Sequence, residues 1–397
     1  MRAKIDIVYT WVDGSDVLWR SKRSEAAREN KDARLIETAN VEGRFRDNGE
    51  LWYSLRALEA YFPDHGQIFL VTDNQKPAWI GQFPCVTVID HTDILDPDGL
   101  PTFSSMNIEA CLHRIDGLSE YYLYFNDDVF LCRNVTEEDF FSGNGVIFNA
   151  SETEVPENAE GSERYTDIQA AAQSIKWLGS QGYSKIVRNL PGHAPMPVIK
   201  STMIEMEQVF PGLFRKARRE KFRCRGSFSL LSDLYYRWMI ATGRGQVVVG
   251  SSVYFETGSP DFERSLRAFE KRSRNSPVFS FCINDTHDNA TPEEMAPAIA
   301  LMQQFCAASI PVVSPRRISQ YLIAISDIVG YNCSDISLDT PLSQICRDRI
   351  SRASVLAAAE KIFGVNIRKG AHDNLETIQD VLDLVCENVI SQRGVGA

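Results

Sequence analysis

Apolar, β-branched runs alternate with helix-forming segments through the first third of this chain, and this alternation limits the possible folds more than any other feature. Strands are predicted at residues 4–11, 67–72, 86–89 and 121–126, with a helix at 104–115 before the last of them. Strands that alternate with helices form a mostly parallel sheet with helices on both faces. We therefore predict an α/β fold for the larger part of the chain.

Acidic and amide side chains follow these predicted strands. Asp73 follows the second strand, and Asn126-Asp127-Asp128 ends the fourth. Because α/β sheets bind ligands at the carboxyl ends of their strands, this pattern indicates a nucleotide-sugar site where acids hold a metal ion against a diphosphate. Asp and Asn are also common turn residues, so simple turn chemistry is the alternative.

Composition argues against nucleic-acid binding, paired cysteines and a membrane-spanning segment. The chain has 397 residues, 44% of them hydrophobic, and a net charge of −11, which argues against nucleic-acid binding. Its nine cysteines form no CxxC pair, as expected of reduced thiols in a cytoplasmic enzyme. No run is long enough to span a membrane and no signal-peptide core is present, so we expect any membrane contact to be peripheral, at the inner face.

The second half of the chain divides into two predicted parts. Helices at 200–218 and 227–241 continue the α/β domain, which we assign to residues 1–312. Residues 313–397 form a separate all-α domain, with amphipathic helices whose apolar spacing is typical of a bundle. These helices are predicted at 317–329, 351–363 and 377–390.

The helical domain resembles the acyl carrier protein family through Asp348-Arg349-Ile350-Ser351 and the following VLAAAEKIFGVNI. In that family the residue after the aspartate is a serine that carries phosphopantetheine. Here that position is Arg349, so no phosphopantetheine is expected, and the domain would instead dock a protein partner. A helical bundle of unrelated ancestry is the alternative.

Four blocks in the larger domain resemble, in order, the four regions of the Stealth family. They are IDIVYTWVDGSD (5–16), the run from RFRDNGELWYSLRALE to FNDDVFL (44–131), PGHAPMP with KFRCR (191–225) and FCINDTHDN (281–289). Stealth proteins are bacterial capsule-type hexose-1-phosphate transferases, related to the catalytic subunit of N-acetylglucosamine-1-phosphotransferase.

The resemblance implies transfer of a sugar 1-phosphate from a UDP- or CDP-type nucleotide sugar to a glycan hydroxyl, with Mg²⁺ or Mn²⁺ as cofactor. It matches Glu109, Asp128, His193 and Arg223 to catalytic positions. His193 suits a general base, Arg223 can fork two phosphoryl oxygens, and Asp128 suits the metal. Glu109 is either a competing base or a residue that orients the acceptor.

Further polar residues match the donor and metal sites of the family. Those matched to donor binding are Asp13, Asp16, Asp47, Asn48, Arg56, Asp73 and Asn126. Asn284 and Asp285 are expected to join Asp128 at the metal. Asp47 or Asn48 could instead start a helix. The family's third region also tends to place an aspartate soon after its arginine, whereas here no acid lies between Arg223 and Asp233.

Two other functions remain open from the sequence. A conventional metal-dependent glycosyltransferase would carry similar acids at its strand ends, although it would not need His193 and Arg223. A non-catalytic glycan-binding protein could use the terminal helices for docking.

Overall fold

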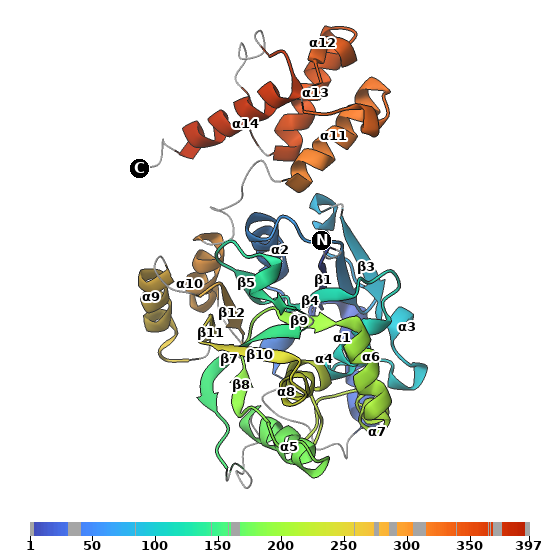
Figure 1. Ribbon diagram of the computed structural model, residues 1–397, viewed down its shortest axis with the longest axis vertical. Coiled ribbons are helices and arrows are strands. Elements are labelled where there is room, and N and C mark those ends of the chain that lie inside the picture. The colour runs from blue at the N-terminus through green and yellow to red at the C-terminus, as the bar shows by residue number, and fades with distance from the viewer. Residues whose placement is uncertain are drawn as a thin grey trace. The chain divides into compact units, whose positions relative to one another are not determined.

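The chain is described by a computed structural model (Figure 1). The described residues are 4–30, 41–83, 85–143, 145–157, 159, 167–257, 259–273, 278–285, 292–304, 315–338, 340–363, 365, 367 and 375–393. They divide into two compact units, Met1–Ala308 (the larger unit) and Ser309–Ala397 (the smaller unit). Within these ranges no helix is both long enough and apolar enough to cross a bilayer.

A five-stranded sheet with the order β3-β2-β1-β4-β9 forms the centre of the larger unit. Its strands are β1 (Asp6–Thr10), β2 (Ile68–Thr72), β3 (Val86–Asp90), β4 (Tyr121–Asn126) and β9 (Met196–Ile199). The first four are parallel, and β9 pairs antiparallel with β4. The predicted α/β fold with a mostly parallel sheet is therefore confirmed.

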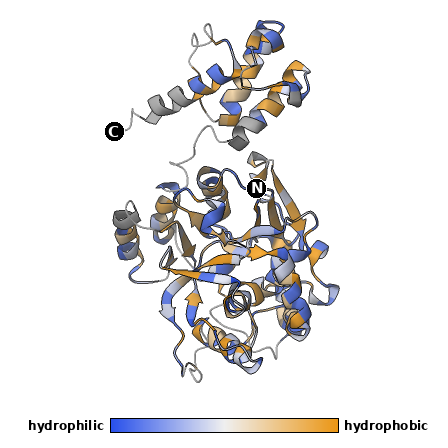
Figure 2. Cartoon of the chain, in the orientation of Figure 1, coloured by the Kyte–Doolittle hydropathy of each residue, from blue (hydrophilic) through white to orange (hydrophobic). Residues whose placement is uncertain are grey.

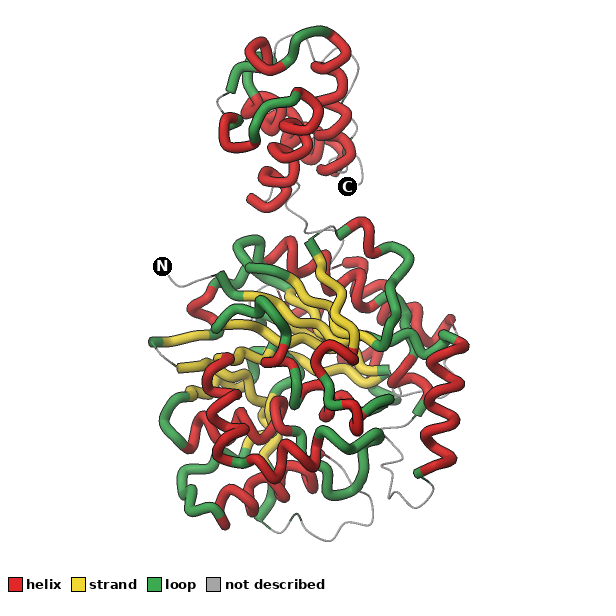
Figure 3. The backbone as a smooth tube through the Cα atoms, turned by 90° about the vertical axis from the view of Figure 1, so that its right-hand side faces the viewer, coloured by secondary structure: helices red, strands yellow, loops and turns green. Residues whose placement is uncertain are grey.

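The apolar runs read from the sequence are the buried strands of this sheet. Every residue of β1 and β2 is buried, as expected where helices cover both faces and a strand therefore lacks polar alternation. Figure 3 shows the strands as a central layer with helices on either side, and Figure 2 shows their apolar character. Each of the four predicted strands lies within two residues of an observed one.

Two smaller sheets complete the strand layer. The order β10-β7-β6 describes the first, in which β8 also pairs with β7. Its strands are β6 (Phe141–Ser142), β7 (Gly145–Glu154), β8 (Asn189–Pro191) and β10 (Gly245–Val249). The second has the order β11-β12-β5, with β5 (Val129–Leu131), β11 (Ser252–Glu256) and β12 (Ser280–Asn284). Because β5 directly follows β4, residues 127 and 128 lie at the turn between two sheets.

Some helices of the larger unit begin or end at residues other than those predicted from the sequence. Its α-helices are α1 (Val17–Glu29), α2 (Glu50–Tyr61), α3 (His91–Ile94), α4 (Ser105–Glu109), α5 (Asp167–Ser180), α6 (Lys200–Val209), α7 (Pro211–Ala217), α8 (Tyr236–Ala241), α9 (Phe262–Ser273) and α10 (Pro292–Met302). The single helix predicted at 200–218 is wrong, because Pro211 lacks an amide hydrogen and starts a new helix.

Two further helix predictions need correction. The helix predicted at 104–115 ends at Glu109, and only a 3₁₀ turn follows at Leu112–Arg114. The helix predicted at 227–241 begins as a π-helix, Leu230–Tyr235, whose wide turn is closed by the amide of Leu234 on the carbonyl of Ser229 at 2.9 Å. Such π-helical turns often occur at functional sites.

The smaller unit is an all-α bundle. It contains α11 (Pro315–Val329), α12 (Leu342–Ile345), α13 (Arg349–Phe363) and α14 (Ile378–Arg393) around one apolar core. Asp348 precedes α13 and accepts a hydrogen bond from the amide of Ser351 at 2.7 Å, and the Ser351 hydroxyl lies 2.8 Å from the same carboxylate oxygen. The Asp348-to-Ser351 motif therefore starts a helix, and exposed Arg349 is the first residue of that helix.

Candidate active site

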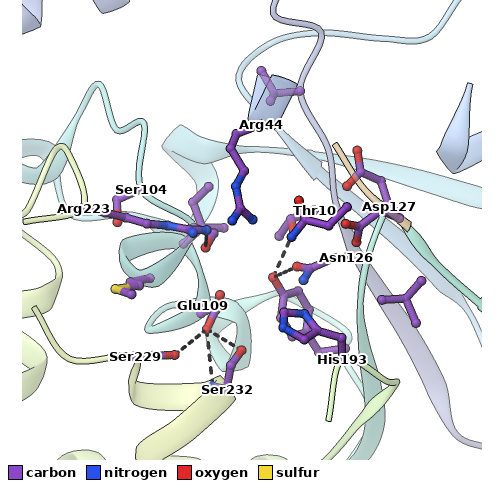
Figure 4. Close-up of a pocket in the computed structure, with 18 of the residues that line it drawn as sticks. Thr10, Arg44, Ser104, Glu109, Asn126, Asp127, His193, Arg223, Ser229 and Ser232 are labelled. Atoms are coloured by element: carbon purple, nitrogen blue, oxygen red, sulfur yellow. Dashed lines mark hydrogen bonds between the residues drawn. The ribbon is translucent and has the colours of Figure 1, made fainter. Parts of the chain in front are cut away.

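A pocket of about 380 Å³ lies at the carboxyl edge of the central sheet (Figure 4). The four residues matched to catalytic positions all line it, together with three of the other predicted site residues. These seven are Glu109, Asn126, Asp128, His193, Arg223, Asn284 and Asp285. The fold thus brings residues that are far apart in the sequence to one cavity.

The strand directions explain this convergence. β4 runs in parallel with β1 and delivers Asn126 to the carboxyl edge. β9 runs the opposite way, with Met196 beside Tyr124, so the segment before Met196 reaches that same edge and carries His193 with it. From the third sheet, the amide of Ile283 donates to the carbonyl of Asp128 at 3.0 Å, which places the end of β12 beside the end of β4.

Glu109 is buried at the end of α4 and faces the π-helical turn. Its Oε2 accepts a hydrogen bond from the Ser232 hydroxyl at 2.8 Å and lies 3.5 Å from the Ser229 hydroxyl (Figure 4). Burial raises the pKa of Glu109, although the Ser232 hydrogen bond and the charge of Arg223 oppose that shift. The protonated form of Glu109 is therefore more accessible than that of an exposed glutamate.

Two arginines point into the pocket (Figure 4). Arg223 donates a hydrogen bond to the Ser105 hydroxyl, and Arg44 enters from the segment before α2. In the part of the chain that the structure describes, neither forms a salt bridge with a carboxylate. Burial and then the charge of Arg44 lower the pKa of Arg223. Two neighbouring guanidinium groups that lack a carboxylate partner are suited to a multiply charged anion.

Asp127 and Asp128 lie on the pocket wall opposite this positive charge. Burial and the adjacent Asp128 carboxylate raise the pKa of Asp127 well above its usual range, and burial also raises the pKa of Asp128. Oδ1 of Asp128 is buried without a hydrogen-bond partner among the described atoms. A divalent cation would satisfy that oxygen and relieve the repulsion, so this pair fits one side of a Mg²⁺ or Mn²⁺ site.

The rest of such a coordination shell would have to come from substrate and water. No group of three or more His, Cys, Asp or Glu side chains suited to a metal converges within the described ranges. Mg²⁺ is commonly held by one or two carboxylates together with substrate phosphates, so the aspartate pair is compatible with that ion.

His193 lies in the pocket wall, where its ring stacks on Tyr254 with the centroids 4.4 Å apart and the planes tilted by 32°. His193 is exposed, and one face of its ring lies against Tyr254. Partial loss of hydration, followed by the positive charges of Arg44 and Arg223, lowers the pKa of His193 to about 4. The imidazole is therefore neutral at physiological pH and can accept a proton.

Asp285 holds a neighbouring loop and is poorly suited to bind metal. Its Oδ2 is 2.6 Å from Nη1 of Arg46 and 3.3 Å from Nδ2 of Asn48, and its Oδ1 is 3.3 Å from the Thr257 hydroxyl. Both oxygens are engaged by protein groups, and the assignment of Asp285 to the metal stays a prediction. The neighbouring Asn284 is buried, and its carbonyl accepts from the Thr257 amide at 3.0 Å.

Several residues matched to donor binding have other contacts and do not line the pocket. Asp16 caps α1 by accepting from the Trp19 amide at 2.8 Å. Arg56 stacks over Phe83 with its guanidinium carbon 4.8 Å from the ring centroid, and it also contacts Glu59. Asp16 and Arg56 therefore serve helix capping and packing, and their donor-binding assignment is not supported by their positions.

Four further residues matched to donor binding also do not line the pocket. Asp13 accepts from the amide of Ser15 at 2.8 Å, Asp47 from the amide of Gly49 at 2.8 Å, and Asp73 pairs with Lys22 at 2.9 Å. Asn48 bonds to Glu50, which does line the pocket. These side chains shape the turns that surround the cavity.

Sequence reasoning missed Arg44, Ser105 and Ser232. Arg44 opens the block RFRDNGELWYSLRALE and was one charge among several there. Its significance depends on its convergence with Arg223, which no local pattern shows. Serines carry little sequence signal, so the partners of Arg223 and Glu109 could not be read from the chain.

Two family models match the chain. Stealth protein CR1, conserved region 1, matches residues 3–31, and Stealth protein CR2, conserved region 2, matches residues 44–148. The second match contains Arg44, Glu109 and Asp128.

Curated relatives carry names that refer to polysaccharide phosphotransfer. An exopolysaccharide phosphotransferase of Streptomyces coelicolor is 36% identical over 79% of this chain and 52% of its own length. A capsular polysaccharide phosphotransferase of Actinobacillus pleuropneumoniae is 34% identical over 74% of this chain and 79% of its own, and one of Neisseria meningitidis is 33% identical over 72% and 78%. The chain spans about half the length of the Streptomyces relatives.

Solved structures of glycosyltransferases show a more distant similarity. The galactosyltransferase LgtC, in complex with donor and acceptor sugar analogues, has 12% identity and a TM-score of 0.37 over 76% of this chain and 96% of that chain. The glycosyltransferase GlyE of Streptococcus pneumoniae has 10% identity and a TM-score of 0.33 over 79% and 66%.

Proposed function

Because the chain belongs to the Stealth family, we propose that it transfers a sugar 1-phosphate from a nucleotide-diphosphate sugar to a glycan hydroxyl. The product would be a phosphodiester-linked sugar in a surface or capsular polysaccharide, and the second product a nucleoside monophosphate. The names of the relatives support this class of reaction.

The single observation that carries the proposal is the distribution of charge in the pocket. Arg44 and Arg223 supply positive charge without a carboxylate partner in the described chain, opposite the Asp127 and Asp128 carboxylates. A diphosphate can accept hydrogen bonds from both guanidiniums. It can also share a cation with the carboxylates.

The reaction would proceed at the phosphorus that carries the sugar. The acceptor oxygen forms a bond to this phosphorus, the bond from phosphorus to the bridging oxygen breaks, and the nucleoside monophosphate leaves with that oxygen. The acceptor proton passes to Nδ1 or Nε2 of His193. The bond between the sugar carbon and its oxygen is untouched, so anomeric configuration is retained. Arg44 and Arg223 stabilise the charge on the transferring group.

The bound diphosphate would also adjust the basicity of His193. In the unliganded pocket the two arginines contribute to the low pKa of His193. A diphosphate would neutralise their charge, so the pKa of His193 would rise toward its ordinary value and make it a stronger base when substrate is present. Glu109, fixed by Ser232, would orient the acceptor hydroxyl.

A divalent cation bound by Asp127 and Asp128 would neutralise phosphate charge and assist departure of the leaving group. The Asp127 and Asp128 side chains would place the diphosphate of the donor at the carboxyl edge of the sheet. The carboxylate pair is retained in this role whether Mg²⁺ or Mn²⁺ is used.

Oxygen labelling provides the test. The chain would be incubated with a panel of nucleotide sugars carrying ¹⁸O between the sugar carbon and phosphorus, with a glycan acceptor and with or without Mg²⁺. We expect release of nucleoside monophosphate, a phosphodiester signal in ³¹P NMR, and the label in the glycan product. Release of nucleoside diphosphate carrying the label would instead establish a conventional glycosyltransferase.

Variants connect the activity to the pocket. Arg44→Gln and Arg223→Gln should each lower kcat/KM by about 10²- to 10³-fold, the usual effect of losing a charged transition-state contact. Arg215→Gln, at an exposed position on α7, is the matched control and should stay near the wild-type value. Unchanged donor turnover in both pocket variants would show that these arginines do not carry the activity, whereas no donor turnover by the wild-type chain would favour a non-catalytic glycan-binding protein.

A further inference from the structure

A second group of polar atoms without partners among the described residues lies at the ends of β2 and β3, and His91 of this group lines the pocket. His91 follows β3, is 4% exposed, and lines the pocket, yet neither ring nitrogen has a hydrogen-bond partner among the described residues. Oγ1 of Thr72 and Oδ2 of Asp73, at the end of β2, are also buried without partners there. Buried polar groups normally find partners, so such a group indicates a missing ligand.

The strand order gives the distance between this group and the phosphate-binding residues. In the order β3-β2-β1-β4, the end of β3 is three strand spacings from the end of β4, where Asp127 and Asp128 lie. At about 4.8 Å per spacing, the two ends are about 14 Å apart along the sheet edge. A nucleoside diphosphate is about this long when extended, so its base would reach the end of β3 if its phosphates lie at β4.

We propose that the β3 end of the pocket binds the nucleobase of the donor, and that His91 pairs with the hydrogen-bonding edge of that base. This inference rests on the proposed function and locates the nucleoside within it. A neutral imidazole offers one donor and one acceptor, as the amide edge of a nucleobase does. Burial lowers the pKa of His91 against the opposing effects of Asp73 and Asp90, which keeps the ring neutral. Trp11 lines the same cavity after β1 and adds an aromatic surface.

Ligands with and without a base test the inference. Binding of uridine, cytidine and guanosine monophosphates would be compared with binding of ribose 5-phosphate, which has the sugar and phosphate alone. In His91→Leu we expect the preferred monophosphate to bind about 10-fold more weakly, and ribose 5-phosphate to bind within about twofold of wild type. His91→Asn, which keeps one donor and one acceptor, should recover part of the loss.

A direct readout is the ¹⁵N chemical shift of the histidine ring nitrogens. The His91 signals should move when the monophosphate is added and stay in place with ribose 5-phosphate. The His65 signals should not move, because Nδ1 of His65 is already 2.7 Å from the Gly66 carbonyl and His65 does not line the pocket.

Two results would overturn the inference. They are unchanged monophosphate binding in His91→Leu, and equal weakening of monophosphate and ribose 5-phosphate binding in that variant. Neither result affects the labelling experiment on the phosphodiester product, so failure at His91 is distinguishable from failure of the transferase proposal.

Discussion

The ion pair between Arg46 and Asp285 should control donor binding without binding metal. It joins the segment that carries Arg44 to the end of β12, with a 2.6 Å contact and the Asp285 side chain 4% exposed. Asp285→Asn keeps a side chain that can bond to Thr257 and Asn48, but it removes the charge opposite Arg46. The segment would then lose this ion pair, and Arg44 would be less well placed for the diphosphate.

The size of the effect follows from the burial of the pair. Removing one partner of a buried ion pair costs about 3–5 kcal/mol, but Arg46 is 27% exposed and can regain part of its hydration. We therefore expect Asp285→Asn to lower the unfolding free energy of the larger unit by about 2 kcal/mol. We also expect KM for the donor to rise about 10-fold through the displaced Arg44.

Urea unfolding and donor kinetics measure these two effects. All six tryptophans precede residue 309, so tryptophan fluorescence reports the larger unit alone. Asp98→Asn is the matched control, since Asp98 and Arg219 form a 2.6 Å pair in which the side chains are 53% and 67% exposed. Its loss should change stability by less than about 0.5 kcal/mol.

The dependence of activity on Mg²⁺ concentration shows whether Asp285 anchors the segment or coordinates the metal. If Asp285 only anchors the segment, the Mg²⁺ concentration for half-maximal activity should be the same in Asp285→Asn and wild type, and adding Arg46→Met should cause little further loss. A large increase in the required Mg²⁺, or a stability loss no greater than that of Asp98→Asn, would refute the reasoning.

Three other outcomes are expected. Because the pKa of His193 is about 4 in the free protein, protonation of His193 should lower kcat/KM only near pH 4, below any limb from the Asp127 and Asp128 carboxyls, whose pKa values are raised; a His193→Gln variant that loses a limb near the ordinary histidine pKa would contradict this. Burial raises the pKa of Glu207, but hydrogen bonds from His113 and Arg218 outweigh it and lower this pKa to about 2. The Glu207 carboxylate therefore stabilises the fold at pH values above its ordinary pKa, and this stabilisation is lost as the pH falls toward 2. Glu207→Gln should flatten that acid dependence in urea midpoints measured at several pH values. Incubation with a phosphopantetheinyl transferase and coenzyme A should add no mass to the chain, and a mass increase would show that Arg349 is not aligned with the attachment site.

The sheet could be predicted from the sequence because its strands are buried on both faces. Such strands read as unbroken apolar runs, and the acids that follow them mark the carboxyl edge. Asp128 could therefore be placed at the end of β4 from its local surroundings. The helix ends were harder to predict, because Pro211 and the π-helical turn both interrupt otherwise helical patterns.

The contacts at the site that join residues far apart in the sequence could not be predicted. Asp285 follows a strand as Asp128 does, and their sequence contexts suggest the same role, yet among the described contacts Asp285 forms an ion pair with an arginine of a distant loop and Asp128 does not. Arg44 and His91 were passed over for the same reason. The surroundings of Arg44 and His91 become visible only when β3, β4 and β9 are ordered in one sheet.

The antiparallel pairing of β9, together with the contact of Asp285 to Arg46, has a consequence for synthesis of the protein. The cavity draws its walls from Thr10 through Asp285, so a nascent chain cannot complete it until most of the larger unit has left the ribosome. A partly made chain would therefore carry Arg44 on a segment that still lacks the ion pair between Arg46 and Asp285.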